Sequence, residues 1–291
     1  MVQLQTSCPE LITDPATIYA LTQKAREQGK TIGLVPTMGA LHRGHLSLVK
    51  TSTAQCDLTV VTIFVNPTQF TDKNDWTKYP RDLQSDMDKL AGSAVGLVFA
   101  PTAEDIYPHG HVTSIHVGPL EEIVEGRCRP GHFSGVATVL AKLFQMIPAH
   151  ITFLGRKDYQ QLKVAERVVQ DLNLPIKVYG CPTIRDEDGL ALSSRNVFLS
   201  HEQRQQALSI RKALKLAERS ITEGETDARM IVACMRSELS RSGTLHIDYA
   251  LLADAETLKP VTTVKGPTVA LIAVRVGSTR LIDNQVMMPQ R

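Results

Sequence analysis

Short apolar segments rich in β-branched residues alternate with helix-like segments along the first two thirds of the chain. The clearest is the run LTVVTIFV at residues 58–65, which is almost uninterrupted. A continuous apolar run of this length is typical of a strand buried on both faces of a parallel sheet. The same pattern predicts other strands at residues 31–36, 96–100, 151–154 and 176–179, and helices beginning near Gly44 and over residues 133–147 and 158–172.

The pattern changes near residue 186. Beyond it, charged segments with helical periodicity at 202–222 and 227–240 precede predicted strands at 245–253, 268–276 and 280–282. Alternating strands and helices predict an α/β domain with a Rossmann-like, doubly wound parallel sheet for residues 1–186. Helices followed by strands predict a smaller α+β domain for residues 187–291. Doubly wound sheets bind ligands beyond the carboxyl ends of their strands, so residues just after strands are the first candidates.

The composition is that of an ordinary globular protein, with 43% hydrophobic and 21% charged residues. A formal net charge of +2 argues against a strongly basic nucleic-acid-binding protein, although it leaves room for a local phosphate pocket. The five cysteines form no CxxC pair, which indicates a reducing compartment and argues against a zinc site. Neither a signal peptide nor an apolar run of membrane-spanning length is visible, so we expect a cytoplasmic protein.

The strongest local motif is PTMGALHRGH at residues 36–45, between the first predicted strand and the first predicted helix. His42 and His45 are three residues apart and would share one face of a helical turn. Gly44 leaves room for a phosphate, and the N–H groups of a starting helix favour an anion. The imidazoles could donate hydrogen bonds to phosphate oxygens as charge builds. HxGH by itself is better explained by two surface histidines at a helix start, but the strand and the Thr-Met-Gly sequence before it favour nucleotide binding.

Other basic side chains must neutralise the phosphates, because the chain has no GxxxxGK[ST] motif. Lys157 follows a predicted strand and could do so, while Asp158 could bind ribose hydroxyls or cap the next helix. The segment DGLALSSRN at 188–196 places two hydroxyls beside Arg195, as in an anion clamp on a closing loop. A polar linker between domains would explain that composition too.

Two glutamines follow predicted strands. Gln69 comes just after the apolar run, and Gln161 lies one helical turn beyond Lys157. A neutral amide could orient a carboxylate nucleophile without neutralising its charge, although both could also be surface residues. The basic, glycine-rich segment at residues 127–135 could border an anion pocket or simply form a turn before a helix.

Taken together, these segments resemble the pantothenate synthetases, a family of the HxGH nucleotidyltransferase superfamily related to class I aminoacyl-tRNA synthetases. The resemblance follows the chain in order over nearly its whole length. The matching stretches are PTMGALHRGH (36–45), FVNPTQF (64–70), YPRD (79–82), GRCRPGHFSGVATVLAKLF (126–144), KDYQQL (157–162), RDEDGLALSSRN (185–196) and GSTRLIDN (277–284).

The resemblance implies the ATP-dependent condensation of (R)-pantoate with β-alanine through a pantoyl adenylate, with release of AMP and pyrophosphate. It implies a proton-donating role for His45, and a phosphate-binding loop at 192–195 in the place of the synthetase KMSKS loop. The residues implied for ATP are Met38, Gly39, Ala40, Leu41, His42, Arg43, Gly44, His45, Gly155, Arg156, Lys157, Asp158, Ile184, Leu192, Ser193, Ser194 and Arg195. The residues implied to be catalytic are His42, His45, Lys157, Ser193, Ser194 and Arg195. The residues implied to bind pantoate and β-alanine are Asn66, Gln69 and Gln161.

The family also implies Mg²⁺, with Asp86 as its candidate ligand, and a homodimer with small-molecule substrates as its partners. One position departs from the family, which has Glu before the Lys-Asp pair where this chain has Arg156. The change is harmless if only the backbone of residue 156 contacts ATP, and it reverses the local charge if the side chain does.

Three other functions fit parts of the same pattern. A nucleotidyltransferase would transfer AMP to a phosphate-bearing acceptor and stop there, whereas the KDYQQL and LALSSRN segments favour the ligase. A non-catalytic nucleotide-binding protein would not need the full set of polar side chains. A tRNA synthetase is disfavoured because no anticodon-binding region or basic surface is apparent.

Overall fold

The structure is a computed structural model that describes residues 8–71, 76–77, 79–241, 243 and 245–289. The first seven residues, which the search for a signal peptide covered, lie outside the described residues. Two compact units are present: Met1–Arg156 with Gln160–Pro182, and Lys157–Tyr159 with Thr183–Arg291. The chain passes to the second unit at Thr183, close to the predicted boundary at residue 186, but the second unit also takes Lys157–Tyr159 from the predicted first domain.

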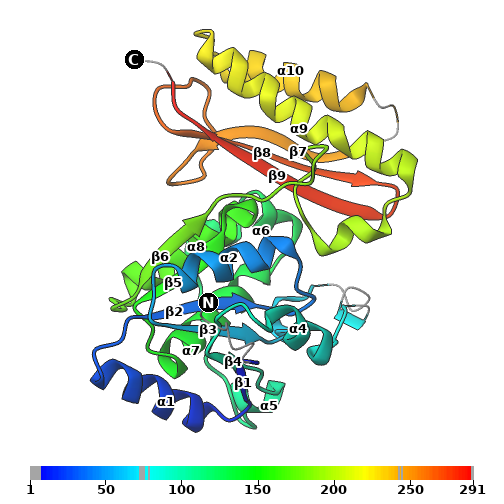
Figure 1. The fold of residues 1–291 in the computed structure, drawn as a ribbon. Helices are drawn as coiled ribbons and strands as arrows, with labels where there is room; N and C mark the ends of the chain where they lie inside the picture. Colours follow the sequence, from blue (N-terminus) through cyan, green and yellow to red (C-terminus); the bar gives the residue numbers. More distant parts are fainter. Residues whose placement is uncertain (1–7, 72–75, 78, 242, 244, 290–291) are drawn as a thin grey trace. The chain divides into compact units, whose positions relative to one another are not determined.

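The first unit is built on a six-stranded sheet whose paired strands are all parallel. Its strands, in spatial order, are β1 (Glu10–Ile12), β4 (Leu97–Phe99), β3 (Leu58–Ile63), β2 (Ile32–Thr37), β5 (Ile151–Gly155) and β6 (Lys177–Cys181) (Figure 1). β2 has β3 on one side and β5 on the other, so the strand order reverses between β2 and β5. The predicted doubly wound parallel sheet is therefore confirmed.

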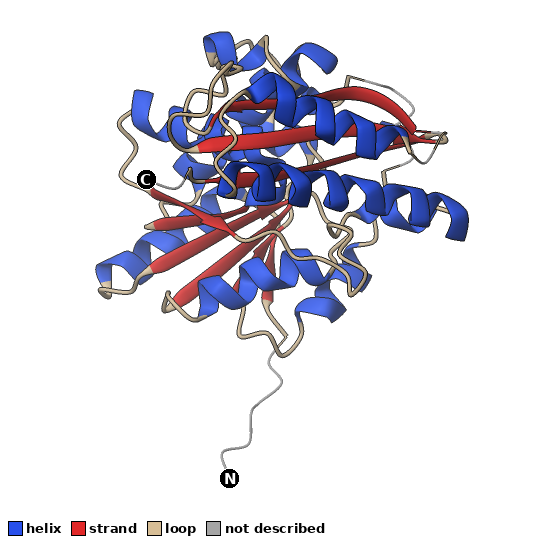
Figure 2. Ribbon diagram, turned by 90° about the horizontal axis from the view of Figure 1, so that it is seen from above, coloured by secondary structure: helices blue, strands red, loops and turns tan. Residues whose placement is uncertain are grey.

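Helices connect these strands. They are α1 (Pro15–Glu27), α2 (Arg43–Thr53), α4 (Leu83–Leu90), α5 (Ala103–Ile106), α6 (Glu125–Cys128), α7 (His132–Met146) and α8 (Tyr159–Asp171). Figure 2 distinguishes the helices from the strands by colour. Among the described residues, no helix combines the length and the apolar character needed to span a membrane.

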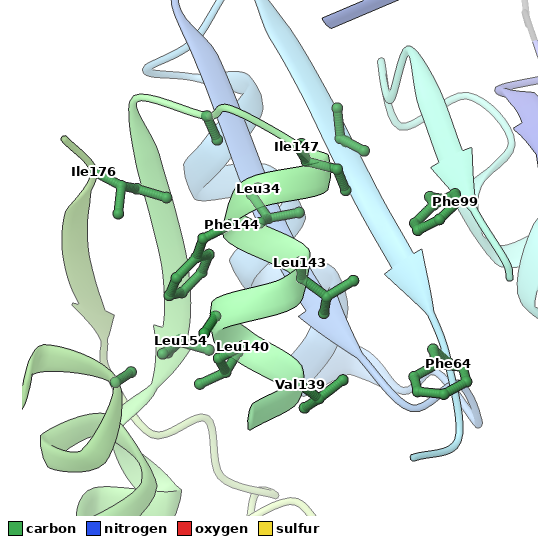
Figure 3. Packing of buried hydrophobic residues seen from close by; sticks show 14 of the residues in the cluster. Leu34, Phe64, Phe99, Val139, Leu140, Leu143, Phe144, Ile147, Leu154 and Ile176 are labelled. Carbon is green, nitrogen blue, oxygen red and sulfur yellow. The ribbon is translucent and has the colours of Figure 1, made fainter. Parts of the chain in front are cut away.

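Successive residues of a strand point to opposite faces of the sheet, and here both faces are buried. Leu34 and Val60 pack on the face covered by α1, α7 and α8. Their neighbours Val35 and Val61 pack with α2 and α4 on the other face. Figure 3 shows Leu140, Leu143 and Phe144 projecting from α7, which lies beside the strands that carry Leu34 and Leu154 of the same cluster. The sheet thus holds its strand ends rigidly between two apolar layers.

The second unit contains an antiparallel sheet of three strands in the order β7 (Leu245–Asp254), β8 (Thr268–Val276) and β9 (Thr279–Met287). Its helices are α9 (His201–Thr222) and α10 (Ala228–Ser240). The residues Ile210, Leu214, Ala217 and Ile221 recur at helical spacing on α9 and form a core with α10 and β8. The predicted smaller α+β domain is confirmed in its fold class.

Candidate active site

The chain turns sharply between β2 and α2, and it does so with two residues in the left-handed region. Gly39 has φ 79° and Ala40 has φ 51°. The N–H of Gly39 donates to Oγ1 of Thr37 over 3.1 Å. A Cβ at Gly39 would lie 2.8 Å from Oδ2 of Asp86, so both the backbone conformation and the space demand glycine.

Asp86, on α4, holds this turn from outside the motif. Its Oδ2 accepts the N–H of Ala40 at 2.8 Å and its Oδ1 accepts the N–H of Leu41 at 2.7 Å. The residue is only 1% exposed, and Nζ of Lys89 lies 3.6 Å from Oδ1. A buried carboxylate with both oxygens bound to backbone amides is suited to fixing a loop. The geometry therefore favours a positioning role for Asp86 over the magnesium-binding role that the family resemblance implies.

The two histidines of the HxGH motif form a capping box at the start of α2. Nδ1 of His42 accepts the N–H of Gly44 at 3.1 Å, and Nδ1 of His45 accepts the N–H of His42 at 3.4 Å. The ring centroids are 4.1 Å apart. A backbone N–H can only donate, so each Nδ1 is unprotonated and each neutral ring carries its proton on Nε2. Each ring can therefore donate a hydrogen bond from its Nε2–H. Both lie at the N-terminus of α2, which favours an anion.

Asn66 follows β3 and is 1% exposed. Its Nδ2 donates to the Gly135 carbonyl and to Oε1 of Gln69, both at 3.1 Å, while its Oδ1 accepts the N–H of Thr68 at 3.3 Å. Both amide protons of Asn66 are therefore engaged within the protein. This geometry favours a role for Asn66 in holding Gln69, in place of the direct substrate contact implied by the resemblance.

Gln69 is 7% exposed and is held from three sides. Besides the bond to Asn66, its Nε2 lies 2.9 Å from Sδ of Met38, in the turn after β2. Its carbonyl oxygen lies 2.7 Å from Nδ1 of His132, which is buried at the start of α7. The sequence did not single out His132, although it belongs to the glycine-rich segment at residues 127–135. Gln69 and the nucleotide-binding motif are thus joined directly.

The two adjacent glutamines of KDYQQL have different surroundings. Gln160 is 4% exposed. Its Oε1 accepts the N–H of Glu125 at 2.9 Å, and its Nε2 donates to the carbonyls of Leu120 and Ile123 at 2.7 and 2.9 Å. Gln160 therefore fixes the segment before α7. Gln161 is half-buried on α8, close behind the carboxyl end of β5. This difference leaves Gln161 as the one of the pair suited to contact a substrate.

Gly155 ends β5, and the short 3₁₀ turn Arg156–Asp158 follows it. The Arg156 side chain lies beside β6, where a Cβ at Gly180 would be 3.2 Å from its Nε. Lys157 is grouped with the second unit, in which its carbonyl accepts Nδ2 of Asn284 at 2.8 Å. Its Nζ lies 3.7 Å from Oδ1 of Asp158. The side chain of Arg156 is thus accommodated against the sheet, which fits a purely backbone role at this position.

In the second unit, the loop that carries the remaining predicted ATP contacts is folded back on itself. The N–H of Leu192 donates to the Ile184 carbonyl at 2.9 Å, so these two predicted contacts are neighbours. Ser193 caps the 3₁₀ turn Ser194–Phe198, and its Oγ accepts the N–H of Arg195 at 3.2 Å.

Ion pairs tie the same loop to its own unit. Arg185 forms a two-pronged pair with Asp283 at 2.6 and 3.0 Å. Arg204 bridges Asp186 and Asp188 at 2.8 Å each. These contacts fix both sides of the loop without using Ser193, Ser194 or Arg195.

The sheet topology brings the candidates of the first unit to one edge. β2, β3 and β5 are adjacent and parallel, so the HxGH turn, Gln69 and Gly155 all follow the carboxyl ends of neighbouring strands. This edge includes the place where the strand order reverses, which is where doubly wound sheets bind their ligands. This arrangement places the anion-favouring N-terminus of α2 beside the amide side chains that follow β3.

Comparison with known proteins agrees with this geometry. The model of the family "Pantoate-beta-alanine ligase" matches residues 10–286. The chain belongs to the pantoate–β-alanine ligase family. The family's enzymes are ligases, also named pantothenate synthetases, that condense pantoate with β-alanine at the expense of ATP through a pantoyl adenylate.

Relatives in this family match over nearly the whole chain. The pantothenate synthetase of Moorella thermoacetica is 46% identical, covering 96% of this chain and 98% of its own. That of Aquifex aeolicus is 49% identical, covering 89% and 92%. These shares leave no large region of the chain outside the similarity.

Two solved structures extend the comparison to the fold. The crystal structure of the Thermus thermophilus pantothenate synthetase superposes with a TM-score of 0.89 at 40% identity, over 95% of this chain and 98% of the other. The Francisella tularensis pantoate–β-alanine ligase superposes with a TM-score of 0.78 at 34% identity, over 96% and 97%, and was solved in complex with β-γ ATP and β-alanine. The pantoate–β-alanine ligase fold thus covers both units.

Proposed function

We propose that this chain forms pantoyl adenylate at the carboxyl edge of its parallel sheet and then transfers the pantoyl group to β-alanine. The capping box at the start of α2 supports this proposal most directly. It presents two Nε2–H donors beside a helix N-terminus, within a member of the pantoate–β-alanine ligase family. Such donors are suited to phosphate oxygens that gain charge in the transition state.

In the first step, an oxygen of the pantoate carboxylate attacks the α-phosphorus of ATP, and the bond to pyrophosphate breaks. This reaction depends on alignment and charge stabilisation. Met38 to His45 would bind ATP, and the Nε2–H of His42 and of His45 would donate hydrogen bonds to phosphate oxygens. The proton-donating role implied for His45 would be this hydrogen bond. Gln69 and Gln161 would orient pantoate by hydrogen bonds, because neutral amides leave the carboxylate its nucleophilic charge.

In the second step, the unprotonated amine of β-alanine attacks the acyl carbon, and AMP leaves as the C–O bond breaks. Gln69 would lie close to β-alanine as well as pantoate. The remaining ATP contacts would come from Gly155 to Asp158, from the backbone of Ile184 and from Leu192 to Arg195. Lys157, Ser193, Ser194 and Arg195 would offset phosphate charge, and closure of residues 188–196 would protect the adenylate from water.

Magnesium is expected to accompany ATP, and when bound it supplies further neutralisation of the phosphate charge. Within the described ranges, no group of three or more His, Cys, Asp or Glu side chains is placed to hold a metal ion. The oxygens of Asp86 already accept two backbone amides. The ion is therefore proposed to bind chiefly to the nucleotide phosphates and water, as is usual for Mg²⁺.

The proposal is tested by following pyrophosphate and AMP from ATP, Mg²⁺ and (R)-pantoate, with and without β-alanine. We expect pyrophosphate to depend on pantoate, and AMP to be released in quantity only when β-alanine is present. AMP that remains attached to a phosphate-bearing acceptor would instead favour a nucleotidyltransferase. A folded sample that binds ATP without turnover would leave only a binding function. A homodimer and a cytoplasmic location remain predictions from the family and the sequence.

A further inference from the structure

A chain of hydrogen bonds runs from the partly buried Tyr107 to the buried amide of Gln69. Tyr107 follows α5, and its hydroxyl donates to Oδ1 of Asn66 at 2.7 Å. Asn66 in turn donates to Oε1 of Gln69. Oγ1 of Thr68 lies 2.9 Å from the same Oδ1 and 3.2 Å from the Tyr107 hydroxyl. No motif in the sequence had pointed to Tyr107.

Backbone groups determine which way these amides face. The N–H of Thr68 can only donate, so it requires an oxygen at Oδ1 of Asn66. The carbonyl of Gly135 can only accept, so it requires the Asn66 nitrogen at Nδ2. The second proton of this nitrogen then faces Gln69, which must present its own oxygen there. The group of Gln69 that faces away from Asn66 is therefore its NH₂, which has two protons. One proton faces Sδ of Met38 at 2.9 Å, and the other is the one that could be donated to a substrate.

The close packing of α7 makes this arrangement difficult to relax. Gly135 lies so close to the turn after β3 that a Cβ there would be 2.5 Å from the Thr68 carbonyl oxygen. Asn66 and Gln69 are 1% and 7% exposed, so water cannot readily replace a lost partner. Burial also raises the pKa of the Tyr107 hydroxyl, which keeps it protonated, and hence a donor, throughout the neutral range.

We propose that Tyr107 is a positioning residue that acts through Asn66 to hold the Gln69 amide with its NH₂ group towards pantoate. The site then selects a substrate that offers hydrogen-bond acceptors, such as the carboxylate and hydroxyls of an α-hydroxy acid. This inference rests on the proposed contact between Gln69 and pantoate. The chain of bonds meets the ATP-binding turn at the contact between Nε2 of Gln69 and Sδ of Met38. A thioether sulfur is a weak acceptor, so we expect the larger effect on pantoate.

The variant Tyr107→Phe removes one hydroxyl and keeps the ring, so it tests the proposal with little risk to the fold. We expect kcat/KM for pantoate to fall about tenfold, which corresponds to about 1.4 kcal/mol of lost transition-state stabilisation. KM for ATP should stay within about twofold of the original value on the same reasoning. Tyr19→Phe on the exposed surface of α1 is the matched control and should leave both constants unchanged.

A double-mutant cycle with Gln69→Ala shows whether Tyr107 acts through Gln69. If it does, Tyr107→Phe has no further effect on kcat/KM for pantoate once Gln69 is truncated. Additive losses, or an equal loss for ATP and pantoate in the single variant, would overturn the positioning role. Normal kcat/KM for pantoate in Gln69→Ala would instead refute the proposed contact between Gln69 and pantoate. If Gln69→Ala lowers kcat/KM for pantoate but Tyr107→Phe does not, only the positioning role of Tyr107 is refuted.

Discussion

The turn after β2 and the loop at residues 183–200 both carry candidate phosphate contacts, but they are held by different forces. In the turn, the 1% exposed carboxylate of Asp86 accepts hydrogen bonds from two backbone amides. The loop is held by ion pairs, of which those of Arg204 are partly exposed and that of Arg185 with Asp283 is largely buried. Val197 and Phe198 at its end are 79% and 64% exposed. Sparse apolar burial is typical of segments that change conformation at low cost. The turn is therefore prepared before the substrate arrives, whereas the loop can adjust.

Removing a prepared donor from the turn gives the largest expected effect. For His45→Ala we expect adenylate formation to fall by about 10²–10³-fold, the cost of one preorganised electrostatic contact. Pyrophosphate release in single-turnover experiments with ATP and pantoate measures this step directly. The unfolding temperature should change little, because the capping bond that Nδ1 of His45 accepts is long, at 3.4 Å.

The exposed His109, changed to alanine, is the control for removing an imidazole from the same unit. Its rate should equal that of the unaltered enzyme. Near-normal pyrophosphate release in a folded His45→Ala variant would contradict the assignment of the HxGH turn as the nucleotide site.

Breaking the ion pair between Arg185 and Asp283 tests how far the loop at residues 183–200 depends on ion pairs for its stability. Asp283 is 4% exposed and pairs with Arg185 through both oxygens, so Asp283→Asn leaves a largely buried guanidinium without its counter-charge. We expect a loss of about 3 kcal/mol in the free energy of unfolding of the second unit. Urea titration followed by circular dichroism measures it.

Glu223→Gln provides the matched control in the same unit. Its partner Arg219 is 74% exposed at the side chain, so this pair should contribute nothing measurable. Equal effects for Asp283→Asn and Glu223→Gln would mean that the loop does not depend on its ion pair.

Weakening the buried clamp of the turn should have a smaller effect on stability. In Asp86→Asn the amide can accept only one of the two backbone N–H groups, so a buried donor loses its partner at a cost of about 1–3 kcal/mol. We also expect kcat to fall by about tenfold or more, because the histidines that follow the turn shift from their aligned positions.

Asp88→Asn makes the same chemical change at an exposed position of the same helix and should leave kcat unchanged. Titration with Mg²⁺ separates the two roles considered for Asp86. Recovery of activity at high Mg²⁺ would support a metal ligand, and a loss that Mg²⁺ does not correct would support the clamp.

The sequence predicted the long elements well because their apolar patterns are strong. The run at 58–65 became β3, and the segment 268–276 became β8. It missed β1, which has only three residues, α4, which has eight, and α1, which buries only Ile18, Thr22 and Ala25. Short edge strands and weakly amphipathic helices gain their stability from tertiary packing, which a local pattern does not contain.

The same limit applies to the site. Motifs and family resemblance pointed to the residues expected to touch substrates, such as His45 and Gln69. They could not show which of these residues serve others: Asn66 proved to be fully engaged within the protein, and Asp86 grips a turn more than 40 positions away in sequence. Tyr107 gave no local signal, because its role depends on a contact over 41 residues of sequence.

The smallest expected effect lies at the opposite, amino edge of the same sheet, where His150 precedes β5. Its Nδ1 accepts the N–H of Ile32 at 3.0 Å, and burial together with the charge of Arg26 lowers the pKa of the imidazole. The pKa of this imidazole is lower in the folded chain than in the unfolded chain. Its contribution to stability is therefore complete above the pKa of the unfolded chain and is lost as the pH falls through the pKa of the folded chain. The unaltered enzyme should therefore lose more unfolding temperature between pH 7.5 and pH 5.5 than His150→Gln, whose side chain can accept the same bond without titrating. Pyrophosphate release at pH 7.5 should be equal in the two proteins, because the amino edge of the sheet lies opposite to the proposed ligand site. A lower rate for His150→Gln at this pH would mean that a change at the amino edge reaches the turn after β2.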